Sequence, residues 1–345
     1  MFENAGRTEI NSLGEFGLID HLTQHFTNTQ INTLTGIGDD AAVIDTGTEE
    51  AMLVSTDMLL EGIHFDLAYM PLKHLGYKAI VINLSDIYAM NGTPQQVTVS
   101  IGFSNRFSLE ALEELYSGIR LACEIYHVDL VGGDTSSAQA GLTISITAIG
   151  KAKKSDITYR KGAEAGDLIA VSGDLGAAFV GLQYLIREKK IYMENPGVQP
   201  ELEGKDYVLE RQLKPEARKD IIEFFNSSNI IPTSMIDISD GLSSELHHLA
   251  KQSGCGMLIH EDKLPIDPMM YNPCIDIGLE ATMCATNGGE DYELLFTIKQ
   301  VDYEKLKLNS DIHIIGYCTD QYGSVKMISK NNNEYPLEAQ GWKAV

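Results

Sequence analysis

Hydrophobic positions along the chain follow two periods that alternate from one segment to the next. Some stretches repeat apolar residues every three or four positions, which indicates helices that bury one face, and others are short apolar or alternating runs, which indicate strands. We predict helices over residues 16–26, 74–90, 109–127, 177–190, 216–225 and 243–252. We predict strands over residues 52–59, 96–103, 128–133, 142–150, 168–173, 234–239, 292–298, 311–317 and 324–329. This alternation predicts an α/β fold with mixed sheets.

The length of the chain predicts more than one domain. Its 345 residues exceed the usual size of a single compact core. Residues 151–167 are polar, contain glycine and are locally basic, so we place the boundary there and predict domains over residues 1–150 and 151–345. A polar insertion runs from Ile191 to Lys214, and its stretch 195–204 contains glycine and two prolines, as is typical of an exposed loop.

Charge and cysteine content restrict the class of protein. The 49 acidic and 26 basic residues give a formal net charge of −23, which argues against nucleic-acid binding and against an anionic membrane surface. Five cysteines without CxxC spacing favour neither a disulfide framework nor a thiolate zinc site. The first residues lack a signal peptide, and every long apolar run is interrupted by charge. We therefore expect a cytoplasmic protein.

Aspartates beside small or polar residues are the strongest chemical signal. They occur in five motifs, which are GDD (38–40), STD (55–57), LSD (84–86), GGDT (132–135) and IDISDG (236–241). Two of them, GGDT and IDISDG, lie where a predicted strand ends, at the sheet edge where ligands bind in open α/β folds. Such oxygen ligands suit Mg²⁺. Each motif alone is typical of a helix cap or a turn, but Asp86 interrupts an apolar helix face, and five together favour a cation site.

Other motifs narrow the chemistry further. The sequence contains no GxxxxGK[ST] loop, no strand followed by GxGxxG, no zinc-protease motif and no GxSxG elbow. His64 follows the STD motif and is a candidate ligand contact, whereas His21, His25, His247 and His248 are typical of structural or solvated positions. Glu290 lies in NGGEDYELLF (287–296), which is either a ligand loop or a capped strand entrance. VSGDLGAA (171–178) favours a tight turn over an anion site.

Six motifs in this order resemble the thiamine-monophosphate kinases. They are GIGDDAAV, STDMLLEGIHF, AIVINLSDIYAMNGTP, VGGDTS, IDISDGLSSEL and NGGEDYELLF, and they extend from about residue 30 to residue 300. The superfamily also contains aminoimidazole ribonucleotide synthetase, selenophosphate synthetase and a hydrogenase-maturation dehydratase. The resemblance implies two α/β domains, a homodimer formed by the amino-terminal halves, and ATP with several Mg²⁺ ions between the domains. The implied reaction transfers the γ-phosphate of ATP to thiamine monophosphate and completes thiamine diphosphate biosynthesis.

The resemblance also assigns roles to residues. It implies a metal set of Asp40, Ser55, Thr56, Asp57, Asp86, Asp134, Asp237 and Asp240. Asp86 and Asp240 would act in catalysis through the metals, with no general base. Nucleotide contacts would come from Tyr116, Gly133, Asp134, Arg160 and Ser239. Substrate contacts would come from His64, Glu290 and Trp342, although the sequence departs from the family pattern around Arg160 and at the carboxyl terminus.

Rival functions have identifiable signatures. The hydrogenase-maturation enzymes carry a reactive cysteine at the carboxyl terminus, but this chain ends WKAV. Selenophosphate synthetases carry a reactive residue near the amino terminus, but no cysteine precedes Cys123. Aminoimidazole ribonucleotide synthetase is the nearest enzymatic alternative. A non-catalytic cation-binding protein is the alternative from another class, and its EF-hand spacing does not occur.

Overall fold

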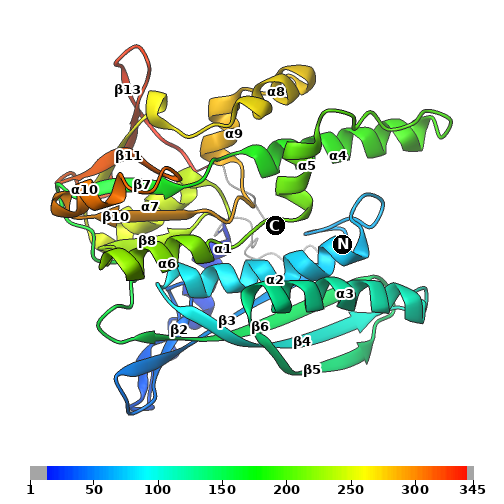
Figure 1. Ribbon diagram of the computed structural model, residues 1–345, viewed down its shortest axis with the longest axis horizontal. Coiled ribbons are helices and arrows are strands. Elements are labelled where there is room, and N and C mark those ends of the chain that lie inside the picture. Colours follow the sequence, from blue (N-terminus) through cyan, green and yellow to red (C-terminus); the bar gives the residue numbers. More distant parts are fainter. Residues whose placement is uncertain (1–13, 340–345) are drawn as a thin grey trace, which may run out of the picture.

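The computed structural model describes residues 14–339 and contains two mixed β-sheets with helices packed on them (Figure 1). In pairing order, the first sheet consists of β1 (Thr33–Thr35), β2 (Ala42–Asp45), β3 (Glu50–Leu60), β6 (Leu142–Lys153), β4 (Thr93–Phe103) and β5 (Asp129–Ser137). The second consists of β13 (Glu334–Pro336), β12 (Val325–Ile328), β9 (Gly256–His260), β11 (Ile312–Thr319), β7 (Leu168–Ser172), β10 (Leu294–Ile298) and β8 (Ser234–Asp237). Strands β4 and β5 pair in parallel, as do β9 and β12, and the other pairs are antiparallel. The predicted α/β class with mixed sheets is confirmed.

The helices confirm the strongest periodic signals of the sequence. They are α1 (Gly14–Thr23), α2 (Leu72–Ala89), α3 (Leu109–Tyr126), α4 (Ala177–Glu194), α5 (Asp206–Leu213), α6 (Lys219–Ser228), α7 (Leu242–Ser253), α8 (Tyr271–Ile277), α9 (Ala281–Asn287) and α10 (Tyr303–Leu306). The hydroxyl of Ser108 accepts a hydrogen bond from the backbone N–H of Ala111 at 3.3 Å, which caps α3 as predicted. None of the helices described is both long and apolar enough to cross a membrane.

Several boundaries differ from the sequence prediction. The polar insertion 191–214 is not a continuous loop, because it contains α5, whose Val208 is fully buried. The stretch 195–204 has neither helix nor strand, as predicted. Strand β5 extends to Ser137, four residues beyond its predicted end, and all of its residues are exposed, so hydrophobicity does not mark where it ends. Short β1, β2, β9 and β13 were not predicted, and neither were the helices α5, α8, α9 and α10.

One apolar core joins the two halves of the molecule. The first sheet ends at Lys153 and the second begins at Leu168, and the residues between them form no helix or strand. The buried cluster around α2 and α3 nevertheless continues into α6 through Phe225 and into β10 through Phe296. The predicted division into residues 1–150 and 151–345 stays a prediction, and what the structure shows is a continuous apolar contact between the two sheets.

Helix α2 is the element on which both halves pack (Figure 1). Most of its residues from Leu75 to Ala89 are buried, which is the pattern of a helix that is apolar on all sides and lies inside a large core. It crosses α3 at two glycines. A Cβ on Gly76 would lie 2.0 Å from the carbonyl oxygen of Leu115, and one on Gly118 would lie 1.8 Å from that of Lys73. The close approach of these helices therefore requires glycine at both positions.

We expect Gly118→Ala to destabilise the protein by about 1–3 kcal/mol, because the added methyl group overlaps backbone that cannot move without separating the helices. The better helix propensity of alanine, worth about 1 kcal/mol, offsets only part of this loss. Urea unfolding measures the difference. Gly197→Ala is the control, since nothing lies within 4 Å of the added atom, and equal stability of the two variants would contradict the packing argument.

Candidate active site

Two adjacent residues of α2 carry the centre of the site. The hydroxyl of Ser55, on β3, donates a hydrogen bond to the carboxylate of Asp86. The hydroxyl of Ser85 donates to Oδ2 of Asp237, at the end of β8, at 2.6 Å. One turn of a buried helix thus contacts the first sheet on one side and the second sheet on the other, as its place between them allows (Figure 1).

Three carboxylates converge where these contacts meet. Asp40 lies just before β2, Asp86 on α2 and Asp237 on β8, and one oxygen from each lies within 4.8 Å of the others. We call these three residues the carboxylate cluster. Its members come from separate positions of the chain and from both sheets, so the cluster forms only when the two halves are packed together.

The electrostatics of the carboxylate cluster favour a bound cation. Burial and the charges of Asp57, Asp237 and Asp40 raise the pKa of Asp86 well above its ordinary range. Burial and the charge of Asp40 raise the pKa of Asp237 to about 7. Oδ2 of Asp40 is buried and has no hydrogen-bond partner among the described residues. Three crowded oxygen ligands, one of them unsatisfied, fit a hard divalent cation such as Mg²⁺.

Strand β3 brings only part of its STD motif to the cluster. Ser55 contacts Asp86, and burial raises the pKa of Asp57, whose charge acts on Asp86. Side chains alternate between the faces of a strand, and the exposed Thr56 donates its hydroxyl to the carbonyl of Ile146 on β6. The structure therefore does not bring the Thr56 hydroxyl to the cluster. Asp57 lies within β3, as it does within the predicted strand 52–59.

Arg160 lies beside Asp40. Its Nη2 and Nε atoms donate to Oδ1 of Asp40 at 2.7 and 3.2 Å, and its backbone N–H donates to Asp39 at 3.1 Å. The ion pair opposes the effect of burial on the pKa of Asp40. Burial and the charge of Asp40 raise the pKa of Asp39 to about 6. Asp39 thus binds the backbone of the segment that connects the two sheets, and the charge of Arg160 partly neutralises the carboxylate cluster.

The DISD part (237–240) of the IDISDG motif has its backbone bound by a residue that was not predicted from the sequence. Ser239 and Asp240 follow β8, and their backbone N–H groups donate to Oε1 of Glu245 on α7 at 3.1 and 2.8 Å. Glu245 is buried, and burial together with Asp240 raises its pKa well above the ordinary range. A glutamate in the first turn of the predicted helix, five residues after Asp240, was the signal that could have found it.

Asp134 and Gly133 lie far across the first sheet from the STD motif. Asp57 pairs with Ile146, which pairs with Val99, which pairs with Gly133. Three strand spacings separate β3 from β5, or about 14 Å. Asp134 is exposed on β5 and lies inside the strand. Within one chain the structure therefore does not bring Asp134 to the carboxylate cluster.

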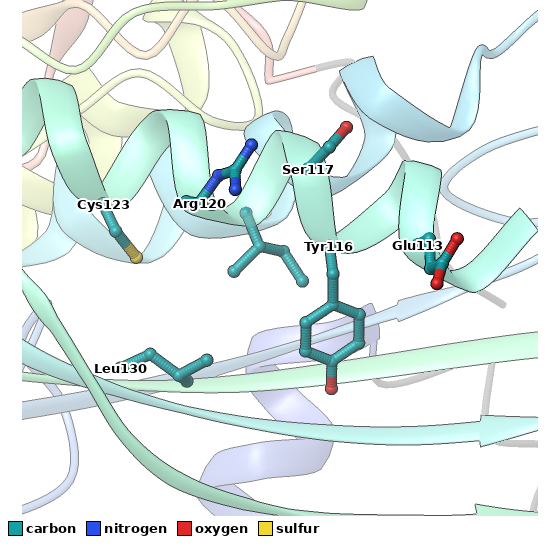
Figure 2. A pocket seen from close by; sticks show the side chains of 7 residues that line it. Glu113, Tyr116, Ser117, Arg120, Cys123 and Leu130 are labelled. Carbon is teal, nitrogen blue, oxygen red and sulfur yellow. The ribbon is translucent and has the colours of Figure 1, made fainter. Parts of the chain in front are cut away.

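A cavity of about 490 Å³ lies between α3 and β5 (Figure 2). The surface exposed to it is mainly apolar, and its lining residues are Glu113, Tyr116, Ser117, Ile119, Arg120, Cys123 and Leu130. Leu130 precedes Gly133 by three residues on the same strand. Tyr116 and Gly133, which were predicted to contact the nucleotide, thus lie at the same edge of the first sheet.

Two of the predicted substrate residues, His64 and Glu290, lie on loops. His64 follows β3, and its Nδ1 accepts a hydrogen bond from the backbone N–H of Leu60 at 3.0 Å. Glu290 precedes β10, and its backbone N–H donates to the carbonyl of Ser239 at 2.7 Å, so its loop is paired with the DISD motif. Trp342 lies outside the described residues.

Comparison with known proteins gives matches along most of the chain. Residues 38–152 match the family described as AIR synthase related protein, N-terminal domain. A thiamine-monophosphate kinase of Bacillus subtilis (strain 168) is 31% identical over 338 residues, or 96% of this chain and 99% of the relative. Another, of Aquifex aeolicus (strain VF5), is 35% identical over 289 residues, or 84% and 87%. The structure of AaThiL complexed with AMPPCP and TMP is 31% identical and superposes with a TM-score of 0.83 over 98% of this chain and 99% of that chain.

We expect Asp86→Asn to stabilise the metal-free protein at pH 8, by about 1–2 kcal/mol, because it removes one of the mutually repelling charges. The folded-state pKa of Asp237, about 7, exceeds the ordinary 3.8. The ionised cluster therefore opposes folding increasingly as the pH rises from about 4 through 7. The gain should be largest at pH 8 and small at pH 5.

Thermal unfolding in excess EDTA at the two pH values measures this effect. Asp320→Asn, at an exposed position remote from the cluster in the fold, is the matched control. Its effect on stability should be small and the same at pH 5 and at pH 8. A metal-free Asp86→Asn protein less stable than the wild type at pH 8 would show that the carboxylates do not repel one another.

Proposed function

The chain belongs to the thiamine-monophosphate kinase family, and from that premise we propose that it transfers the γ-phosphate of ATP directly to thiamine monophosphate, giving thiamine diphosphate and ADP. The observation that carries the proposal is the carboxylate cluster, which both halves of the molecule assemble. The choice of substrate is supported by the relatives, one of which was solved with AMPPCP, an ATP analogue, and TMP.

The proposed reaction must bring two anionic phosphates together. A phosphate monoester has a second pKa near 6, so the acceptor oxygen is largely ionised at neutral pH and needs no general base. At 4 Å each pair of unit charges repels by about 1 kcal/mol in water and by roughly 4 kcal/mol at an effective dielectric constant of 20. Several Mg²⁺ ions, when bound, neutralise this charge and stabilise the loose transition state of phosphoryl transfer.

The residues of the chain would position the reactants and the ions. Asp40, Asp86 and Asp237 would hold Mg²⁺, with Asp57 and Asp240 beside them. Ser55 and Ser85 orient two of the carboxylates, and Glu245 holds the backbone of Asp240. No lysine of a nucleotide-binding loop is required for this arrangement. Release of Arg160 from Asp40 would allow its guanidinium to contact a phosphate once cations occupy the cluster.

The nucleotide is proposed to span the first sheet. The apolar cavity between α3 and β5 suits an adenine ring beside Tyr116 (Figure 2). Gly133 has φ +157° in β5, and a Cβ there would lie 1.8 Å from the carbonyl oxygen of Val99, so the close pairing of β4 and β5 requires glycine beside Asp134. His64, Glu290 and Trp342 are proposed to contact thiamine monophosphate.

We propose a homodimer in which Asp134 completes the site of the partner subunit. Within one chain, about 14 Å of sheet separates the strand of Asp134 from that of Asp57. Strand β5 is an exposed edge with unpaired backbone groups, and native proteins usually cover such edges.

All five cysteines are free thiols, which agrees with a reducing cytoplasm as the proposed location.

Asp86→Asn and Asp240→Asn are each expected to lower kcat by at least about 100-fold, because each removes a charge that holds the cations in the transition state. The assay follows ATP consumption with thiamine monophosphate and detects thiamine diphosphate directly. Asp320→Asn should retain the wild-type rate. The proposed function is wrong if the wild-type protein forms no thiamine diphosphate at saturating Mg²⁺, and the metal role is wrong if both variants turn over normally.

Mixing two inactive variants tests the shared site. Dimers of Asp86→Asn and Asp134→Asn chains contain one site with both changes and one with neither, so a mixed population should regain about a quarter of the wild-type activity. Asp86→Asn mixed with Asp237→Asn is the control and should regain none, because these residues share one cluster. No recovery from co-refolded Asp86→Asn and Asp134→Asn chains would place Asp134 in the site of its own chain.

A further inference from the structure

The carboxylate of Glu290 is held by two side chains from two other elements. Nζ of Lys78, on α2, lies 3.2 Å from Oε1 of Glu290. Nε2 of Gln212, on α5, donates to Oε2 at 2.7 Å. Nζ of Lys78 also donates to the backbone carbonyl of Gln212 at 3.0 Å. We call these three residues the Glu290 cluster, and in it both oxygens of one carboxylate have a donor.

Lys78 is an unusual residue for its position. Its side chain is only 2% exposed, whereas that of Glu290 is 26% exposed. A lysine is rarely buried to this degree without a paired carboxylate, because the charged ammonium group loses its hydration. Lys78 lies on the helix that carries Asp86, so the rigid element that positions the carboxylate cluster also positions Glu290.

The backbone of Glu290 is constrained as well. Glu290 and Tyr292 have φ values of +66° and +53°, a left-handed conformation that non-glycine residues rarely adopt. Their N–H groups donate to the carbonyls of Ser239 at 2.7 Å and Ile238 at 2.9 Å. Backbone strain of this kind persists only where surrounding contacts impose it, and it concentrates at functional sites.

Helix α5 is fixed independently of Glu290. Nη2 of Arg211, the neighbour of Gln212, lies 3.0 Å from Oε1 of the buried Glu293 and donates to the carbonyl of Asp174 at 3.0 Å. The hydroxyl of Tyr207 donates to the carboxylate of Asp174 at 2.5 Å. These contacts join the loop of residues 171–178 to that of residues 287–293, so Gln212 approaches Glu290 from a helix anchored on both loops.

The carboxylate of Glu290 is partly exposed and has the chemistry to bind an organic cation. Each carboxylate oxygen can accept two hydrogen bonds, so Glu290 keeps acceptor capacity after binding Lys78 and Gln212. Burial, the charge of Asp66 and the charge of Glu290 raise the pKa of Tyr69, from the segment after His64, to about 12. Thiamine monophosphate carries a thiazolium cation and an aminopyrimidine, which offer a positive charge and N–H donors to such a carboxylate.

We propose that Lys78 and Gln212 are positioning residues that fix the Glu290 carboxylate to receive the aminopyrimidine–thiazolium part of thiamine monophosphate. The inference rests on the proposed function. Neither residue touches the reacting phosphates, so their loss should weaken binding of the acceptor and leave phosphoryl transfer from ATP largely unaffected once the acceptor is bound.

Lys78→Met and Gln212→Met test the proposal, because it predicts a change in one kinetic constant and little change in the others. Each should raise KM for thiamine monophosphate roughly tenfold, the expected effect of losing one hydrogen bond to a charged group. The KM for ATP and kcat should stay within about twofold. Lys73→Met, an exposed lysine on the same helix, is the matched control and should leave all three constants unchanged.

A double-mutant cycle with Glu290→Gln separates positioning from a general effect on folding. If Lys78 acts through Glu290, Lys78→Met should raise KM less than about twofold in the Glu290→Gln background. Calorimetric titration with thiamine monophosphate should show the same pattern in Kd. Additive effects, or an equal loss in kcat and in the KM for ATP, would overturn the positioning role.

The outcome also distinguishes this proposal from the proposed function. A wild-type protein that neither binds nor phosphorylates thiamine monophosphate would overturn both. A wild-type protein that is active, together with Lys78→Met and Gln212→Met variants of unchanged KM, would overturn only the positioning role. Gln212→Met keeps the test decisive if Lys78→Met does not fold, since the backbone carbonyl that binds Lys78 is retained.

Discussion

The mutual repulsion of three carboxylates is the constraint on which the arrangement of this protein depends. Oxygens of Asp40, Asp86 and Asp237 lie within 4.8 Å of one another, and at such a distance each pair of charges repels by up to several kcal/mol in a partly buried site. A fold can hold such a cluster only if other contacts oppose its separation. The apolar core that continues from α2 into α6 and β10 supplies that opposition, and the glycine crossing of α2 and α3 fixes the helix that carries Asp86.

The same constraint explains why the site lies between the two sheets and not at the end of one. A cluster within one sheet would disrupt the core of that sheet, whereas at the junction each half contributes only part of the charge. Ser85 donates a hydrogen bond to the carboxylate of Asp237, and Glu245 accepts one from the backbone N–H of Asp240. Neither residue adds a positive charge that would compete with a cation for the cluster.

The sequence predicted features that depend on local patterns. Helix α3 shows a strong period and α2 a long, mostly apolar run, and Ser108 is a local capping signal. Strand β1 has only three residues, too few to show a period, and α5 lies in a polar insertion where one buried valine is its main apolar anchor. In the site, aspartate motifs predicted Asp40, Asp86 and Asp237, and the alternation of side chains along a strand already places Thr56 on the face opposite Ser55 and Asp57. No local pattern shows that Lys78 meets Glu290, because the packing of α2 against the loop before β10 determines that contact.

Helix α2 also relates the two ends of the acceptor to each other. Lys78 and Asp86 are eight residues apart on one unbroken helix, or about 12 Å along its axis. The places where the organic group and the phosphate of the acceptor would bind are therefore set by a single rigid element and cannot move independently. Selectivity between phosphate esters would then depend on molecular length as well as on charge, and an ester with a much shorter organic group could occupy one end of the site but not both.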